Sequence, residues 1–359
     1  QWGQDFRPSY LRILDFIDSL PRRPIVSAFT ATATREVKDD IAQTLRLRDP
    51  EIVITGFDRP NLYYRVETTR RKDAFVADYV RSHPGESGII YCATRKNVDA
   101  VQEMLRGEDI SAARYHAGMT NEERRQSQND FIYDTAPVIV ATNAFGMGID
   151  KSNVRYVIHY NMPQSMENYY QEAGRAGRDG LPSQCILLFS PQDIVINRFL
   201  LDHKENDDLD DEAADLLRAR DNQRLQAMAN YCQTTGCLRN YILRYFGEEP
   251  AEPCGSCGNC DRVYAETDMT AQAKWMINCV AETRGRYGKG VVLNTLRGAN
   301  MARLRELGAM DYRSYGQLKD CTRDELDCLL AQLLEEGYLV QTDDQYAVLH
   351  IGDIAPLKA

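Results

Sequence analysis

Two arginines set among glycines are the residues of this sequence that most clearly suggest chemistry. Arg175 and Arg178 lie three positions apart, just after Gln171 and Glu172. On a helix this spacing places both guanidinium groups on one face, and the glycines let phosphate or backbone oxygens approach closely. A guanidinium held in this way can stabilise charge on a transferring γ-phosphoryl group. The alternative is a helix end whose arginines pair with Glu172 and Asp179.

A run of cysteines forms the second chemical signal. Cys254, Cys257 and Cys260 are separated by two residues each, with glycines between them. Three such thiolates can wrap one tetrahedral ion, and either Cys232 or Cys237 can supply the fourth ligand. Zinc is favoured over an iron–sulfur cluster because no redox chemistry is implied nearby, and free or bridged thiols are the alternative. Such a site serves folding, so losing the metal should unfold this part of the chain.

The residues between 64 and 202 alternate between short apolar strands and helices. The expected strands cover residues 88–92, 112–115, 138–141, 154–160 and 185–189. A capping box formed by Thr120 and Glu123 is expected to open one of the helices. This alternation predicts a parallel sheet covered on both faces, with ligands beyond the carboxyl ends of its strands. Loop 142–150 lies at such an end, although a sharp turn also explains its glycines.

The first 63 residues combine aromatic side chains with further predicted elements. Trp2 and Phe6 flank Arg7, and they can form a stacking platform for unpaired bases or simply seat the helix that follows. Residues 24–30 and 51–55 are predicted to be strands. A helix is expected between them, from near residue 34 to near residue 47.

The residues from 267 onward predict three helices followed by a two-stranded wing. This arrangement is a winged helix, whose natural partner is duplex DNA, with protein binding as the alternative. A basic stretch without acidic residues falls inside it, formed by Arg284, Arg286, Lys289, Arg297, Arg303 and Arg305. Such a local basic face is compatible with DNA as the partner.

Composition limits the class of protein. A chain of 359 residues with a net charge of −10 suggests two to four domains and argues against non-specific nucleic-acid binding by the whole molecule. No apolar run is long enough to span a bilayer, and no signal segment opens the chain. Ten cysteines without an export signal favour a reducing, intracellular setting, cytoplasmic and nucleoid-associated in a bacterium or nuclear in a eukaryote.

Several segments resemble motifs of superfamily 2 helicases and follow one another in the same order along the chain. Their residues resemble those of the RecQ DNA helicases. Residues 169–180 resemble motif VI. The other matching segments are residues 30–33 (motif III), 57–62 (the crossing between lobes), 89–92 (motif IV) and 142–150 (motif V). The resemblance covers about residues 1–350, and it places the first metal ligand at Cys237, ahead of residues 245–248.

The resemblance implies an α/β architecture and an activity. Residues 1–63 would be the C-terminal part of a first RecA-like lobe and residues 64–202 a second RecA-like lobe. Residues 203–266 would be a helical zinc-binding module and residues 267–359 a winged helix. The chain would be part of an ATP-dependent 3′-to-5′ DNA helicase for recombination and repair, with structural Zn²⁺ and with ATP and Mg²⁺ in the complete enzyme.

The resemblance also assigns site residues. Those near the nucleotide are Gly148, Asp150, Gln171, Arg175 and Arg178, and either arginine can be the finger. Those on DNA single-strand/duplex junctions are Trp2, Phe6, Arg7, Thr94, His116, Thr142, Asn143, Arg286, Lys289 and Arg297. The metal ligands are Cys237, Cys254, Cys257 and Cys260.

Two motifs that a complete helicase needs do not occur in the sequence. These are the Gly-x4-Gly-Lys-Ser/Thr phosphate loop and the acidic metal-binding box. The sequence is therefore expected to begin just after a DEAH box, and the isolated chain is expected not to hydrolyse ATP. One alternative is a zinc-stabilised winged-helix DNA-binding protein, which has no need for the two arginines or for loop 142–150. Another is an RNA helicase, which would not carry the zinc and winged-helix tail.

Overall fold

The computed structural model describes residues 12–30, 35–53, 56–146, 150–202, 211–250, 252–262, 267–342 and 347–353. The chain forms two compact units. The first contains residues 1–193 and 236–261, and the second contains residues 194–235 and 262–359. The cysteine-rich segment therefore belongs to the same unit as the predicted sheet, although more than forty residues of the other unit separate them in sequence.

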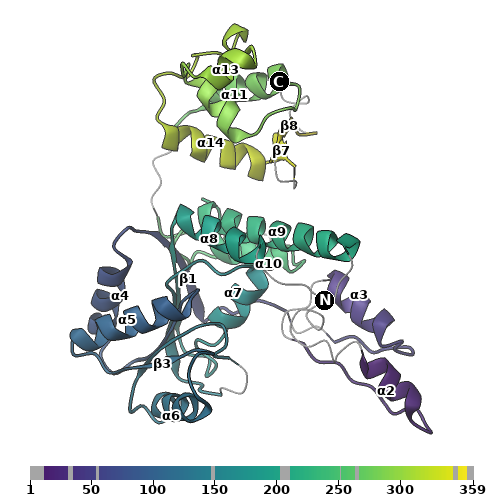
Figure 1. Cartoon of the computed structure of the whole chain (residues 1–359), viewed down its shortest axis with the longest axis vertical. Helices are drawn as coiled ribbons and strands as arrows, with labels where there is room; N and C mark the ends of the chain where they lie inside the picture. Colours follow the sequence, from purple (N-terminus) through teal and green to yellow (C-terminus); the bar gives the residue numbers. More distant parts are fainter. Residues whose placement is uncertain are drawn as a thin grey trace. The chain divides into compact units, whose positions relative to one another are not determined.

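The first unit is built on a sheet of six parallel strands (Figure 1). The strands are β1 (Leu62–Thr68), β2 (Ser87–Tyr91), β3 (Ala112–Tyr115), β4 (Val138–Ala141), β5 (Val154–His159) and β6 (Ser183–Phe189). Their order across the sheet is β1-β6-β5-β2-β4-β3, which makes β1 and β3 the edge strands. Strands β2 and β4 are buried along their whole length, as expected for strands covered on both faces. The predicted parallel α/β lobe is confirmed.

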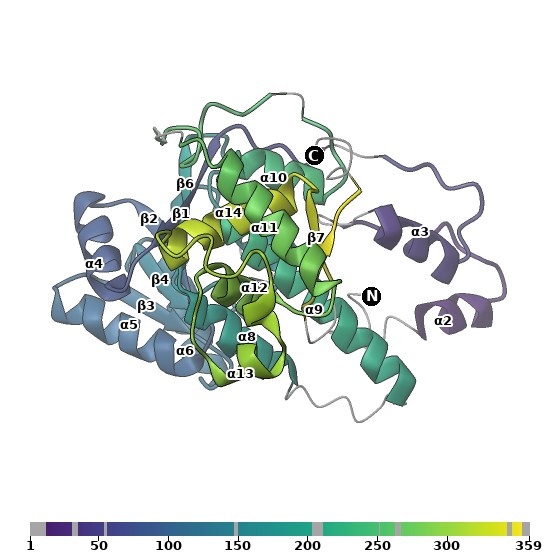
Figure 2. The ribbon, with the colours of Figure 1, turned by 90° about the horizontal axis from the view of Figure 1, so that it is seen from above.

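Helices cover both faces of this sheet. They are α4 (Lys72–Ser82), α5 (Arg95–Gly107), α6 (Asn121–Ile132) and α7 (Met166–Ala173). Helices α4 and α5 lie side by side (Figures 1 and 2). They share one core with the strands, in which Ile90 is fully buried and Val101 almost fully buried. On the opposite face, the ring of Tyr169 in α7 packs against Tyr64 of β1 and His159 of β5.

Short-range side-chain signals determine where these helices begin. The hydroxyl of Thr120 accepts a hydrogen bond from the N–H of Glu123, whose carboxylate accepts one from the N–H of Thr120. This pair confirms the predicted capping box at the start of α6. Thr94 and Ser165 cap α5 and α7 in the same manner through one side-chain acceptor each.

Two strands predicted near the start of the chain are not found among the residues that the structure describes there. This region contains α2 (Ile13–Ser19) and α3 (Arg35–Thr44), the latter close to its predicted place. Residues 24–30 and 51–53, however, form no strand, and residues 54–55 of the second predicted strand lie outside the described residues. Ile25 and Phe29 are 97% and 94% exposed. A strand needs hydrogen-bonded neighbours, and these apolar runs have none among the described residues. The prediction of strands there was wrong.

The second unit contains the predicted winged helix. Its elements are α9 (Asp211–Gln233), α11 (Thr270–Thr283), α12 (Lys289–Leu296), α13 (Ala302–Glu306), the 3₁₀ turn η2 (Ala309–Asp311), α14 (Arg323–Glu335), β7 (Leu339–Gln341) and β8 (Leu349–Ile351). Helix α8 (Pro191–Asp202) spans the sequence boundary between the two units. Strands β7 and β8 pair antiparallel as a short wing, and α11, α12 and α14 share a buried core with both strands. The predicted three helices and wing are confirmed.

In the described part of the chain, no helix combines the length and the apolar character that crossing a membrane requires.

Candidate metal centre and arginine turn

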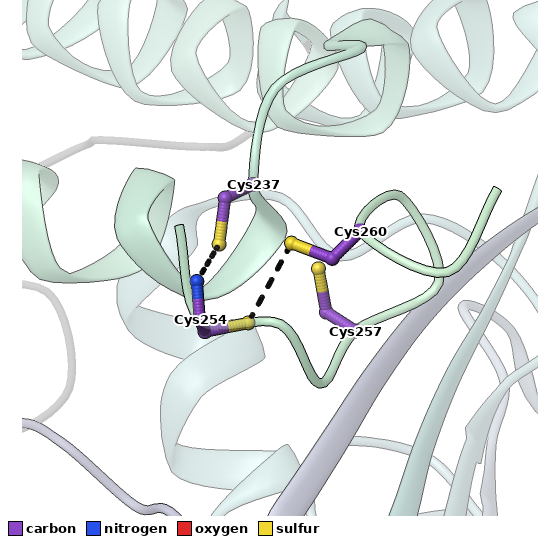
Figure 3. A group of neighbouring side chains, drawn as sticks. All are labelled: Cys237, Cys254, Cys257 and Cys260. Atoms are coloured by element: carbon purple, nitrogen blue, oxygen red, sulfur yellow. Dashed lines mark hydrogen bonds between the residues drawn. The ribbon is translucent and has the colours of Figure 1, made fainter. Parts of the chain in front are cut away.

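Four cysteine side chains converge beside the start of α10 (Leu238–Tyr245). The Sγ atoms of Cys237, Cys254, Cys257 and Cys260 all lie within 4.8 Å of one another, and those of Cys254 and Cys260 are 3.9 Å apart (Figure 3). A tetrahedral zinc site with Zn–S bonds of about 2.3 Å places its sulfurs about 3.8 Å apart. The cluster therefore fits one tetrahedral ion, and its fourth thiol is that of Cys237.

Backbone N–H groups donate hydrogen bonds to thiols of the cluster. The Sγ atom of Cys237 accepts from the N–H groups of Asn240 and Cys254. Burial acts to raise the pKa of the Cys257 thiol, but hydrogen bonds from nearby backbone N–H groups, including those of Cys260 and Leu238, outweigh it and lower this pKa to about 7. Burial raises the pKa of Cys254 and of Cys260. A bound cation would remove that penalty by replacing the protons on the sulfurs.

The cysteine module, residues 236–261, packs along the edge strand β1. The N–H of Gly258 donates to the carbonyl oxygen of Tyr64 at 2.8 Å, and the hydroxyl of Tyr63 donates to Asp261 at 2.7 Å. A Cβ atom on Gly258 would stand 3.3 Å from the Cα of Arg65, so glycine permits this close approach. The module thereby satisfies backbone groups that an edge strand would otherwise expose.

The two arginines of motif VI lie beyond a helix, in a turn. Helix α7 ends at Ala173, and residues 174–179, here called the arginine turn, follow as successive turns. Gly177 has φ +56°, a left-handed conformation that ends any continuation of the helix, and its N–H donates to the carbonyl of Val154 at 2.9 Å. The prediction that Arg175 and Arg178 share one face of a helix was therefore wrong.

Arg175 is held against the loop after β4. Its Nη1 donates to the carbonyl oxygen of Gly146 at 2.8 Å, and a Cβ atom on Gly146 would lie 2.3 Å from Nη2. The hydroxyl of Tyr91 donates to the adjacent Phe145 carbonyl at 3.0 Å. Burial raises the pKa of Tyr91, an effect that the nearby Arg175 guanidinium partly offsets. Arg175 thus supports the loop from within the lobe.

Arg178 is placed differently. Its side chain is 37% exposed, and its Nη1 lies 3.5 Å from Oδ1 of Asp150, whose own side chain is 94% exposed. An ion pair this exposed contributes little free energy, so Asp150 can be exchanged for another anion at small cost. Gln171 lies half-buried in the last turn of α7, and Gly148 lies outside the described residues.

The predicted DNA contacts of the sheet lie at its carboxyl edge. Thr94 follows β2, His116 follows β3, and Thr142 and Asn143 follow β4, three strands that are neighbours in the order β2-β4-β3. His116 is buried, with Nε2 3.2 Å from Asp99 and Nδ1 accepting from the N–H of Gly118. Thr142 is buried and Asn143 exposed. The structure therefore brings these residues to one edge, where Asn143 presents its side chain outward.

The remaining predicted DNA contacts lie at the two ends of the sequence. Arg286 and Arg297 are exposed on the winged helix, and Lys289 pairs with Asp327 at 3.1 Å. Trp2, Phe6 and Arg7 lie outside the described residues. These assignments stay predictions, as do the residue ranges of the four predicted domains.

Comparison with known proteins gives the same order of parts. The helicase conserved C-terminal domain model matches residues 71–180, the RecQ zinc-binding model matches residues 191–261 and the RQC domain model matches residues 264–355. The ATP-dependent DNA helicase RecQ of Bacillus subtilis is 42% identical over 352 residues, which is 98% of this chain and 58% of the relative. The chain belongs to the RecQ family.

Other relatives cover similar shares. The ATP-dependent DNA helicase RecQ of Pasteurella multocida is 35% identical over 96% of this chain and 53% of its own length. A putative ATP-dependent RNA helicase of a mimivirus is 36% identical over 83% of this chain and 55% of its own length. This RecQ-family chain thus spans between half and three fifths of the length of these three relatives.

The RecQ zinc-binding match covers all four clustered cysteines. Together with sulfur spacing that fits a tetrahedral site, it supports structural zinc in this RecQ module. Sequence reasoning missed a second group of residues, Arg59, Asn61 and Arg239, whose side chains bind backbone carbonyls around the arginine turn and the module. Residues 57–62 resembled the crossing between lobes, but no spacing rule indicated their hydrogen-bond partners.

Proposed function

We propose that this chain is the arginine-donating lobe and the DNA-gripping part of an ATP-dependent DNA helicase that unwinds with 3′-to-5′ polarity in recombination and repair. The observation that carries the proposal is Arg178, an exposed guanidinium at the end of a RecA-like lobe that is followed by a zinc module and a winged helix. Relatives that are named ATP-dependent DNA helicases support it.

The two arginines have separate tasks in this proposal. ATP with Mg²⁺ would supply the γ-phosphoryl group, held by a phosphate loop and an acidic box outside these residues. Arg178 is the finger, since its exposed contact with Asp150 can be exchanged for phosphate oxygens. Arg175 supports loop 142–146 through the Gly146 carbonyl, so it links the nucleotide side of the lobe to its carboxyl edge.

The DNA would be held at two places. The carboxyl edge that carries Thr94, Thr142 and Asn143 would follow one strand through its phosphates. The winged helix, with Arg286 and Arg297 exposed, would hold the duplex beside the fork. Zinc has no part in the chemistry here, because the four thiols leave no open coordination position.

The test uses a fluorescent fork with a 3′ single-stranded tail. The full-length gene product should unwind it only with ATP, and should unwind an RNA fork of the same sequence poorly. The 359-residue chain alone should bind the fork with salt-sensitive affinity and should not hydrolyse ATP. Salt-sensitive binding by a full-length protein that lacks DNA-stimulated ATPase activity would instead support a non-motor DNA-binding protein. Equal unwinding of the RNA fork would support an RNA helicase.

A further inference from the structure

The connecting segment, residues 57–62, lies directly against the arginine turn. The guanidinium of Arg59 donates to three carbonyl oxygens of the turn, those of Gly174 at 3.3 Å and of Ala176 and Gly177 at 3.1 Å. These carbonyls flank Arg175 and precede Arg178. A planar guanidinium with several fixed donors suits this task, because it can fix the positions of several acceptors at once.

A neighbouring amide adds to this hold. The side-chain NH₂ group of Asn61 donates to the carbonyls of Gly177 at 2.8 Å and Leu181 at 3.0 Å. The backbone carbonyl of Asn61 accepts from the N–H of Ser183 at 2.9 Å, as β1 and β6 begin to pair. The Gly177 carbonyl therefore accepts hydrogen bonds from both Arg59 and Asn61. These bonds fix the arginine turn to the beginning of β1.

The other side of the connecting segment is fastened to the cysteine module. Arg239, whose side chain is 8% exposed, lies 3.1 Å from the carboxylate of Asp58 and donates to the carbonyls of Pro60 and Leu62 at 3.3 and 2.8 Å. The ring of Phe57 stacks on that of Phe246 at 4.5 Å. Arg239 is two residues from Cys237, so the metal centre and the arginine turn hold opposite sides of one short segment.

We propose that Arg59 is a positioning residue for ATP hydrolysis, which fixes the backbone of the arginine turn so that Arg178 reaches the γ-phosphate, and that Arg239 anchors this arrangement on the cysteine module. The proposal rests on the function proposed above. Arg175 has its own hold on the Gly146 carbonyl. Loss of Arg59 releases the carbonyls of Ala176 and Gly177, the two residues directly before Arg178.

The first test is the steady-state ATPase activity of the full-length gene product with saturating fork DNA. Arg59→Gln is expected to lower kcat about 10²-fold, the effect of displacing a catalytic group by about 1 Å, with KM for ATP, fork affinity and bound zinc unchanged. Arg59→Lys keeps the charge but not the planar set of donors, so its kcat should lie between those of the wild type and Arg59→Gln. Val101→Ala shortens a buried side chain of α5. This variant is the control for lost stability and should leave kcat unchanged.

The second test asks whether Arg59 acts through Arg178. If it does, Arg59→Gln combined with Arg178→Ala hydrolyses ATP as slowly as Arg178→Ala alone. Asn61→Ala removes only the neutral contacts and should lower kcat about tenfold, which keeps the proposal testable if Arg59→Gln does not fold.

Four outcomes would count against the proposals. Losses that multiply in the double variant, or a normal kcat in both Arg59→Gln and Asn61→Ala, would overturn the positioning role. A wild-type protein without DNA-stimulated ATPase activity would overturn the proposed function itself. Zinc loss from Arg59→Gln with kcat restored by added zinc would show a merely structural role, which also overturns the positioning role.

Discussion

The cysteine cluster and the arginine turn lie in the same compact unit but are organised in opposite ways. The cluster is supplied by residues 237–260, and much of its support comes from backbone N–H groups within that same segment. The arginine turn receives Arg59 from 115 to 118 residues earlier in the chain. A site supported by residues nearby in sequence can be recognised from residue spacing. The geometry of a site supported by distant residues depends on the whole fold.

Removing the metal should have the largest effect. Structural zinc contributes about 10–16 kcal/mol of apparent binding free energy to small modules, so Cys254→Ala or chelation should unfold residues 236–261. Hydrogen exchange of the backbone amides of α10 would report this loss, with zinc content measured in parallel. Cys328→Ala, an exposed cysteine of α14, is the matched control and should change neither. Full protection of α10 in the zinc-free protein would contradict the account.

Replacing the two arginines should separate their roles. Arg178→Ala in the full-length protein is expected to lower kcat about 10³- to 10⁵-fold, the usual contribution of an arginine finger, while the melting temperature stays unchanged. Arg175→Ala should instead lower the melting temperature, because it removes the hydrogen bond to the part-buried Gly146 carbonyl. Calorimetry and ATPase assays on both variants check this. Equal changes in both quantities would show that the arginines act as one group.

A pair of glycine variants tests how tightly the turn is held. Gly177 and Gly180 both have positive φ, +56° and +82°. A Cβ on Gly177 would lie 2.4 Å from Nδ2 of Asn61 and 2.8 Å from the Leu181 carbonyl, whereas one on Gly180 would meet nothing within 4 Å. Gly180→Ala should cost about 1–3 kcal/mol from backbone strain alone, and Gly177→Ala more. Urea unfolding measures both, and equal losses would mean that the Asn61 contact is loose.

The smallest expected effect is the pH dependence of the cysteine cluster. The pKa of Cys257 falls from 9.0 to about 7 on folding, so its thiolate stabilises the folded module above pH 9, and this stabilisation is lost as the pH falls through about 7. Because protons compete with zinc for this sulfur, zinc removal by a chelator should become easier as the pH falls below about 7, by about tenfold per pH unit for each thiolate protonated. A chelation rate independent of pH would contradict this assignment.

The pattern of successes and failures in the sequence predictions follows the same division. Capping at Thr120 and the two-stranded wing were predictable because each depends on residues close together in the sequence. Strands β3 and β4 were predictable because the alternation of strands and helices supplies their partners. The apolar runs near Ile25 and Ile52 carry the same β-type signal, but they are not strands, because pairing is a property of partners elsewhere in the chain.

The arginine turn shows this limit within a recognised motif. The residue types of motif VI were identified, but their predicted placement on a helix was wrong, since α7 ends at Ala173 and the left-handed φ of Gly177 prevents the helix from continuing through Arg178. The roles of Arg59 and Arg239 lie in hydrogen bonds to carbonyl oxygens, and any residue except proline offers the same backbone groups. No sequence pattern could therefore predict those partners.

The most direct test of the central claim is a structure of the full-length protein with ADP and a γ-phosphate mimic at the nucleotide site. The account predicts that the guanidinium of Arg178 leaves Asp150 and hydrogen-bonds to the mimic. Arg175 should stay on the Gly146 carbonyl and Arg59 on the carbonyls of the arginine turn. An Arg175 guanidinium on the mimic, with Arg178 still beside Asp150, would contradict it.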